Sequence, residues 1–255
     1  MTTQTAPTLV LLPGLDGTGK LFPRFLEALN EAIDNLDARV IAYPLGLPLG
    51  YEELEARVRS ALPKDRPFVL LGESFSGPIA IRIAADPPPN LRGVIFCGTF
   101  AKNPFPRLGW ASPLAFLVPM KSLPRWVRAP LMWGSKRDVR VPPRAERAIA
   151  GVDRAVVRRR IASLLTVDAT ESLKRIAVPA LVIYAKRDRV ISYTATRRLF
   201  EHIPRAEVVA VDGPHLLLQA APLECAAVVA EFLQRRLPIT DSKSRLPGPD
   251  RTAVA

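Results

Sequence analysis

The stretch LLGESFSGPIAIRIAA, residues 70–85, joins an apolar strand-like run to a helix-like run through a turn of small residues. Ser74 is at the centre of the turn, with Gly72 two positions before it and Ser76 two positions after it. A nucleophile at a sharp strand-to-helix turn needs small residues at both places, because the two backbones pass close together there. Ser74 is therefore a candidate nucleophile, although a turn that only connects strand and helix would use the same residue types.

The apolar run before Ser74 is one of six short runs that predict β-strands. The runs are continuous rather than alternating, as expected for parallel strands that are buried on both faces. Amphipathic segments such as 51–62 lie between them and predict helices. This alternation predicts an α/β fold with a mostly parallel, doubly wound sheet of about six strands. The predicted strands cover residues 8–13, 39–44, 67–72, 93–98, 180–185 and 207–212.

The alternation stops after the fourth strand and resumes at the fifth. Residues 101–175 contain no comparable strand-like run and are rich in Pro, Trp and Arg, which predicts short helices and loops. We therefore expect a helical insertion at 101–175 within a core formed by 1–100 and 176–237. Residues 238–255 are polar and rich in Pro, and their composition predicts a disordered tail.

A serine nucleophile needs a base, and the chain contains only two histidines. His202 lies near the end of a helix-like segment, where a solvated or capping role is expected. His215 directly follows the last predicted strand, in VVAVDGPH. Loops at the carboxyl ends of parallel strands are where open α/β sheets place ligands and catalytic groups. His215 is therefore the candidate base.

Three aspartates compete to orient this histidine. Asp188 follows the fifth predicted strand, in YAKRDRV. Asp212 lies in a D-G-P sequence that suits a turn, and Asp168 lies in the inserted segment. Position favours Asp188, which gives the chain order nucleophile, acid, base.

Together these features resemble the α/β-hydrolase superfamily. The resemblance covers roughly 8–100 and 178–236, and its motifs are the Pro-Gly loop after the first strand, GESFSG, RDRV and GPH. It implies a serine hydrolase of the esterase or thioesterase type, with 101–175 as the cap that such proteins insert at this place. Relatives that open epoxides or displace halide commonly use an aspartate nucleophile, so Ser74 argues against those activities. The first predicted strand of this chain, 8–13, resembles the third strand of the family pattern.

The loop after the first strand, GLDGTGK, is one residue short of a phosphate-binding P-loop. A P-loop needs Ser or Thr after its Lys, but Leu21 follows Lys20 here. The resemblance implies a different use, in which backbone N–H groups stabilise the oxyanion of an acyl transfer. The expected donors are Leu15 in this loop and Phe75, the residue after the nucleophile. Lys20 is then a solvated residue near the first helix.

The inserted segment has two further features. Its stretch 108–120 is apolar, which suits either helices that pack on the core or a pocket wall for an acyl or alkyl chain built from Trp110, Phe116 and Met120. The segment 101–175 also carries 16 Lys and Arg against 5 Asp and Glu, almost the whole net charge of +12. This surplus includes Arg158, Arg159 and Arg160. It forms either a solvated face or a surface that attracts an acidic partner, such as an acyl carrier protein, an anionic surface or an acidic substrate. Nucleic acid is not expected.

Composition limits the cellular setting. Cys97 and Cys225 both lie in apolar segments, which predicts buried free thiols rather than a disulfide. No apolar run reaches the roughly 18–20 residues of a membrane span, and no secretory signal is visible at the N-terminus. We expect a cytoplasmic protein that needs no metal or organic cofactor.

The sequence therefore predicts a serine hydrolase that cleaves a carboxylic ester or thioester through an acyl-enzyme. Two alternatives stay open. An acyltransferase would pass the acyl group to an alcohol instead of water, and a ligand-binding or signalling protein would retain the triad on a hydrolase scaffold. The sequence does not determine the acyl chain or the leaving group.

Overall fold

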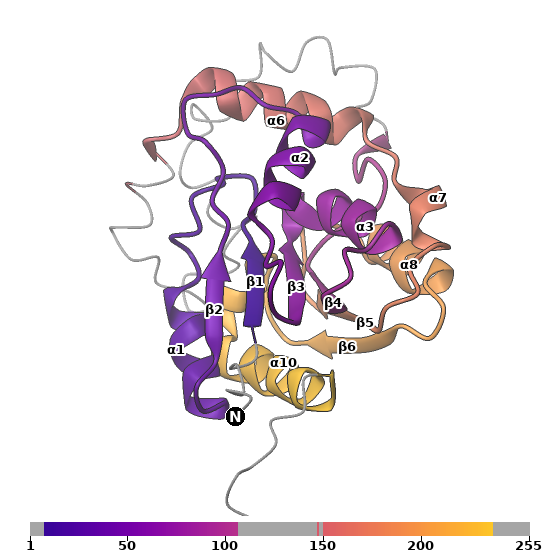
Figure 1. Cartoon of the computed structure of the whole chain (residues 1–255). Coiled ribbons are helices and arrows are strands. Elements are labelled where there is room, and N and C mark those ends of the chain that lie inside the picture. The colour runs from indigo at the N-terminus through magenta and orange to yellow at the C-terminus, as the bar shows by residue number, and fades with distance from the viewer. Residues whose placement is uncertain (1–7, 107–146, 148–149, 237–255) are drawn as a thin grey trace, which may run out of the picture.

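A computed structural model describes residues 8–106, 147 and 150–236 (Figure 1). Their centre is a single sheet of six strands, in which every neighbouring pair is parallel. This confirms the predicted α/β class and the parallel sheet. In spatial order the strands are β2 (Asp37–Val40), β1 (Thr8–Leu12), β3 (Phe68–Glu73), β4 (Leu91–Cys97), β5 (Ala180–Ala185) and β6 (Glu207–Val211).

Helices cover both faces of the sheet, as expected for a doubly wound fold (Figure 1). Each face has its own apolar cluster, because the strands between them direct alternate side chains to opposite sides. One cluster contains α1 (Pro23–Ala32) and α10 (Pro222–Arg236). The other contains α2 (Tyr51–Ala61), α3 (Gly77–Ala85) and α8 (Tyr193–His202).

Burial explains why the strands read as continuous apolar runs. Every residue of β1 and β3 is buried, because both strands lie inside the sheet and are covered on both faces. The edge strands β2 and β6 are only partly buried, and Val208 in β6 is 41% exposed. The interior strands therefore gave the clearest sequence signal.

The second strand shows a difference in its bounds. Residues 39–44 were predicted to form it, but β2 ends at Val40, which is paired with Leu11 at the end of the β1 register. The chain then crosses to the loop after β1, where the Tyr43 N–H donates to the Gly17 carbonyl at 2.8 Å. Of the predicted residues beyond Val40, Tyr43 is the buried one, and its backbone is held by this loop contact rather than by the sheet.

Two helices of the inserted segment are described, α6 (Arg154–Thr166) and α7 (Thr170–Leu173). Figure 1 shows α6 lying across the carboxyl ends of the strands. Lys102 and Asp168 form an antiparallel bridge where the segment leaves and rejoins the core. Two short helices, η1 (Ser74–Ser76) and α9 (Leu217–Ala220), complete the described elements. Trp110, Phe116, Met120 and the tail 238–255 lie outside the described residues.

The turn between β3 and α3 depends on a close contact at Gly72. A Cβ atom at Gly72 would lie 2.8 Å from the Cβ of Ala80 and 3.1 Å from the carbonyl oxygen of Ser76. Both distances are shorter than ordinary van der Waals contacts, so the strand and the helix approach each other more closely than a side chain at position 72 allows. The small residue predicted two positions before Ser74 is required for this packing.

A double-mutant cycle tests this contact. Gly72→Ala is expected to lower the free energy of unfolding by about 1–3 kcal/mol through overpacking. Ala80→Gly removes the nearest opposing methyl group at a helix cost of about 1 kcal/mol. The double variant should be more stable than the sum of the single effects by at least about 0.5 kcal/mol, measured by urea denaturation. Ala84→Gly, one turn further along α3, is the matched control. If the effect of Gly72→Ala were equally additive with Ala80→Gly and with Ala84→Gly, the contact would be contradicted.

Candidate active site

Ser74 has an unusual backbone conformation, with φ at 49°. A non-glycine residue in this left-handed region is strained and must be held by its surroundings. The Thr99 hydroxyl, at the end of β4, donates a hydrogen bond to the Ser74 carbonyl. Gly77 lets the two segments meet, because a Cβ atom there would lie 1.8 Å from Thr99 Oγ1. The turn between β3 and α3 thus places Ser74 at the strained backbone angle that was expected at this position.

The structure brings Ser74, His215 and Asp188 together. Ser74 Oγ lies 2.9 Å from His215 Nε2, and His215 Nδ1 lies 2.9 Å from Asp188 Oδ2. These residues follow β3, β6 and β5, three parallel strands whose carboxyl ends meet at one edge of the sheet. Residues 141 positions apart in the chain therefore form one line of hydrogen bonds.

The carboxylate of Asp188 is fixed by its own loop. Its second oxygen, Oδ1, accepts hydrogen bonds at 2.8 Å from the backbone N–H groups of Val190 and Ile191. The side chains of His215 and Asp188 are only 1% and 7% exposed. A buried, fully hydrogen-bonded carboxylate can hold the imidazole in one tautomer and stabilise its protonated form.

The competing residues are occupied elsewhere. Asp212 is exposed and forms an ion pair with Arg187 at 2.8 Å. His202 lies on the surface of α8 with Nδ1 2.9 Å from the Arg198 carbonyl, in agreement with the solvated or capping role expected of it. Asp168 forms an ion pair with Lys102 at 2.8 Å. None of the three contacts Ser74 in the described structure.

The loop after β1 lies beside the nucleophile. A Cβ atom at Gly14 would lie 3.7 Å from Ser74 Cβ, and the Gly17 N–H closes a turn on the Gly14 carbonyl at 3.0 Å. Leu15 is the second residue of this turn, and among the described residues its N–H has no hydrogen-bond partner. Phe75 N–H lies at the start of η1, where backbone donors have no partner within the helix. Leu15 and Phe75 therefore stay predicted as the oxyanion donors, in two segments that meet at Ser74.

A family model described as "Alpha/beta hydrolase family" matches residues 9–228. The chain belongs to this family. It is 26% identical over 254 residues to a putative carbamate hydrolase RutD of Rhizobium rhizogenes, covering 91% of this chain and 94% of that protein. This α/β hydrolase also has the fold of an enol-lactonase from Burkholderia xenovorans, with 20% identity, a TM-score of 0.77 and coverage of 92% and 94%. A hydrolase from Pseudomonas aeruginosa matches with 21% identity, a TM-score of 0.73 and coverage of 89% and 90%.

Ser76 occupies the position where many nucleophile turns have glycine, and its hydroxyl has a specific use in this hydrolase. The side chain is completely buried, and Oγ donates to the carbonyl of Pro13. The hydroxyl of Tyr43 completes the arrangement by hydrogen bonding to the same Oγ. The serine therefore ties the nucleophile turn to the start of the Pro13–Gly17 loop, which glycine could not do.

Sequence analysis gave no role to Glu73, the buried residue directly before the nucleophile. Gln219 Nε2 donates to its Oε1 at 2.9 Å, and the Gly14 N–H also interacts with the carboxyl. Burial raises the pKa of Glu73 to about 7, against the lowering influence of Gln219. The charged residue in GESFSG was visible in the sequence, but its hydrogen-bond partner Gln219 lies 146 positions away.

Arg160 corrects one sequence-based interpretation. It was grouped with Arg158 and Arg159 as part of a basic surface, but it is only 1% exposed. The signal was its spacing: Val156, Arg160 and Leu164 are four residues apart and share the inward side of α6. Arg158 and Arg159 remain exposed, so the attraction for an acidic partner stays a prediction that no longer includes Arg160.

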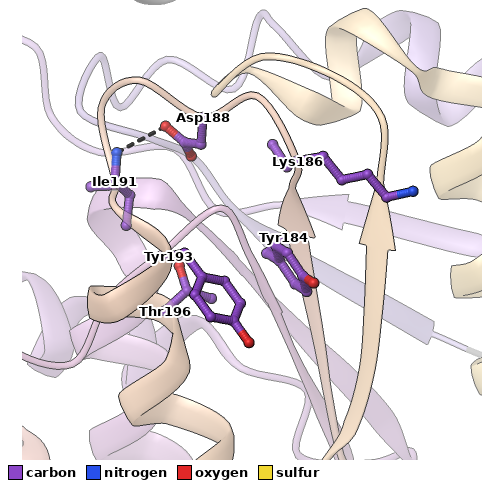
Figure 2. Close-up of a pocket in the computed structure, with 7 residues that line it drawn as sticks. Tyr184, Lys186, Asp188, Ile191, Tyr193 and Thr196 are labelled. Atoms are coloured by element: carbon purple, nitrogen blue, oxygen red, sulfur yellow. Dashed lines mark hydrogen bonds between the residues drawn. The ribbon is translucent and has the colours of Figure 1, made fainter.

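A cavity of about 350 Å³ lies beside the Asp188 loop (Figure 2). Figure 2 shows Tyr184 from β5 and Tyr193 from α8 next to each other, with ring centres 5.4 Å apart, while the Lys186 side chain extends away from Asp188. Neither Ser74 nor His215 lines this cavity. Of these three residues, only Asp188 borders the cavity.

Cys97 and Cys225 are free and buried, which confirms that expectation, and burial raises the pKa of both thiols. Within the described ranges, no group of three or more His, Cys, Asp or Glu side chains could hold a metal ion. In the same part of the chain, no helix has the length and apolar character needed to cross a membrane.

The raised pKa of Glu73 predicts a pH dependence of stability. Because its pKa is about 7 when folded and 4.5 as a free group, the folded state binds more protons between these values. Stability through this group must therefore fall as the pH rises from 5 to 8, by about 2 kcal/mol. Glu73→Gln should remove this part of the decrease, measured by urea denaturation at both pH values. The exposed Glu27→Gln is the control, and equal pH dependence in the two variants would refute the assignment.

Proposed function

We propose that this α/β hydrolase cleaves a carboxylic ester or thioester through an acyl-enzyme on Ser74. The observation that carries the proposal is the unbroken line from Ser74 Oγ through His215 to Asp188, with 2.9 Å at each step. A hydroxyl is a weak nucleophile unless a neighbouring base accepts its proton, and this line supplies the base and the group that orients it.

Acylation follows from this geometry. His215 Nε2 accepts the proton of Ser74 as Oγ attacks the substrate carbonyl, and Asp188 stabilises the imidazolium that forms. The negative charge on the carbonyl oxygen develops beside the N–H groups of Leu15 and Phe75. When the tetrahedral intermediate collapses, His215 returns the proton to the leaving alkoxide or thiolate.

Deacylation uses the same groups in reverse. His215 accepts a proton from water, which attacks the acyl carbon, and the same two N–H groups stabilise the second oxyanion. His215 then protonates Ser74 Oγ as the acid is released. The residues in named roles need no metal or organic cofactor for these steps.

The similar proteins support the substrate class at a coarse level. One is named an enol-lactonase and another a putative carbamate hydrolase. A lactone and a carbamate both present a carbonyl carbon with a heteroatom leaving group, the feature that this site would attack. A small acyl compound is therefore the class of substrate that we propose.

Replacement of the nucleophile tests the mechanism. Ser74→Ala should lower kcat for a short p-nitrophenyl ester by about 10⁴–10⁶-fold, because the acyl-enzyme can no longer form. The wild-type protein should also be labelled by a fluorophosphonate on Ser74, found by mass spectrometry of the digest. The exposed Ser60→Ala is the matched control. Failure of the wild type to label and turn over would instead favour a ligand-binding protein on this scaffold.

The role of the carboxylate has its own test. Asp188→Asn keeps the shape of the side chain but removes the charge that orients and stabilises His215, so kcat should fall by up to about 10⁴-fold. Asp212→Asn, which changes only the exposed ion pair with Arg187, should leave kcat unchanged. The reverse ranking would move the acid to Asp212. Product analysis with and without an added alcohol separates hydrolysis from transfer to an alcohol acceptor.

A further inference from the structure

The guanidinium of Arg160 reaches from α6 into the loop that carries the Leu15 N–H. Nη1 donates to the carbonyls of Leu15 and Asp16, both at 2.9 Å, and Nη2 donates to the Pro44 carbonyl at 3.0 Å. The guanidinium carbon lies 5.5 Å from the centre of the Tyr43 ring. One side chain from the inserted segment thus contacts both segments that lie behind the nucleophile turn.

The loop is shaped to receive this guanidinium. Gly17 has a φ of 71°, and a Cβ atom there would lie 2.4 Å from Arg160 Nη1. A side chain at position 17 would be strained and would also displace the guanidinium. The Gly17 carbonyl is held separately, by the Tyr43 N–H. The second glycine of the GLDG sequence therefore fits the arginine contact as well as the turn.

The hydrogen bonds of the loop determine where the Leu15 N–H points. The peptide between Gly14 and Leu15 is planar, so the direction of the Gly14 carbonyl sets the opposite direction of the Leu15 N–H. That carbonyl accepts from Gly17 N–H across the turn. The two carbonyls between them are the ones that Arg160 holds, so the guanidinium prevents the central peptides of the turn from rotating.

Burial of the charged Arg160 side chain costs more free energy than packing alone would require. Among the described residues its Nε has no hydrogen-bond partner, and burial lowers the pKa of Arg160 in spite of the opposing influences of Tyr43 and Asp16. Burying a charge carries a desolvation cost that an apolar side chain of similar length avoids. Since Val156 and Leu164 already provide apolar contacts on the same side of α6, the fold alone does not call for a cation here.

We propose that Arg160 is a positioning residue that holds the Leu15 N–H in place for the oxyanion, and that the inserted segment thereby takes part in catalysis. This inference rests on the proposed serine hydrolase function. Arg160 contacts no reacting atom; it acts through the Leu15–Gly17 backbone. Its loss should therefore reduce the stabilisation of the transition state more than the binding of substrate.

Arg160→Met tests the proposal because it keeps an unbranched, apolar stem and removes the donors. On a p-nitrophenyl ester, kcat should fall by about 10–100-fold with KM changed less than about threefold, as expected for a displaced oxyanion donor. Affinity for a phenylboronic acid, which forms a tetrahedral adduct on the serine, should fall in parallel. Arg158→Met, on the exposed side of the same helix, should match the wild type in all three measurements.

Arg160→Lys is the second variant. It retains the charge, but a single ammonium cannot reproduce the forked contacts to Leu15, Asp16 and Pro44, so kcat should lie between wild type and Arg160→Met. If Arg160→Met does not fold, a lowered kcat at unchanged KM in Arg160→Lys supports the proposal. Wild-type kcat in whichever variant is folded overturns it. Failure of the proposed function is recognised separately, because Ser74→Ala would then leave esterase activity intact.

Discussion

The left-handed backbone of Ser74 is the constraint from which the arrangement of the site follows. A φ of 49° on a residue with a side chain is unfavourable by itself and persists only because neighbouring elements hold it. Gly72 and Gly77 let β3, α3 and the end of β4 approach closely enough to do so, and Thr99 secures the Ser74 carbonyl. The parallel sheet then brings the loops after β5 and β6 to the same edge, where His215 contacts the Ser74 hydroxyl and Asp188 contacts His215.

The Pro13–Gly17 loop is organised by the same principle. Each backbone carbonyl from Pro13 to Gly17 has a partner, and these partners come from four different parts of the chain. Ser76 holds the first carbonyl from the nucleophile turn, and Arg160 holds two from α6. The Leu15 N–H is left without a partner among the described residues. A loop with satisfied carbonyls and a free donor is preorganised for an anion, since no reorganisation is required when charge develops.

Buried polar groups distinguish this site from its apolar surroundings. Glu73 is hydrogen bonded to Gln219, and the guanidinium of Arg160 lies over the ring of Tyr43. Glu73 and Arg160 are costly to bury, and each contacts the backbone of the Pro13–Gly17 loop. The desolvation cost of these two side chains therefore falls at the loop that lies next to Ser74.

The interior strands, the nucleophile turn and the order of Ser74, Asp188 and His215 could be predicted because each is a local pattern. Continuous apolar runs, small residues around a serine and polar residues just after a strand are visible within a few positions. The edge strand β2 was misplaced at its end because Tyr43, an apolar residue after Val40, is buried against a loop from elsewhere in the chain. Arg160 was misread because a basic residue in a basic segment looks solvated unless its partners are known.

The sequence by itself determined the α/β alternation, the parallel sheet and the residues able to form a catalytic line, because hydrophobic periodicity and turn chemistry are encoded over short distances. Only the tertiary structure decided which groups meet: His215 with Asp188, Glu73 with Gln219, and Arg160 with the Leu15 loop. Hydrogen bonds between residues 27 to 146 positions apart depend on how strands and helices pack. An arginine is therefore a solvated surface charge at position 158, whereas Arg160, two residues later, is buried and hydrogen bonded to loop carbonyls.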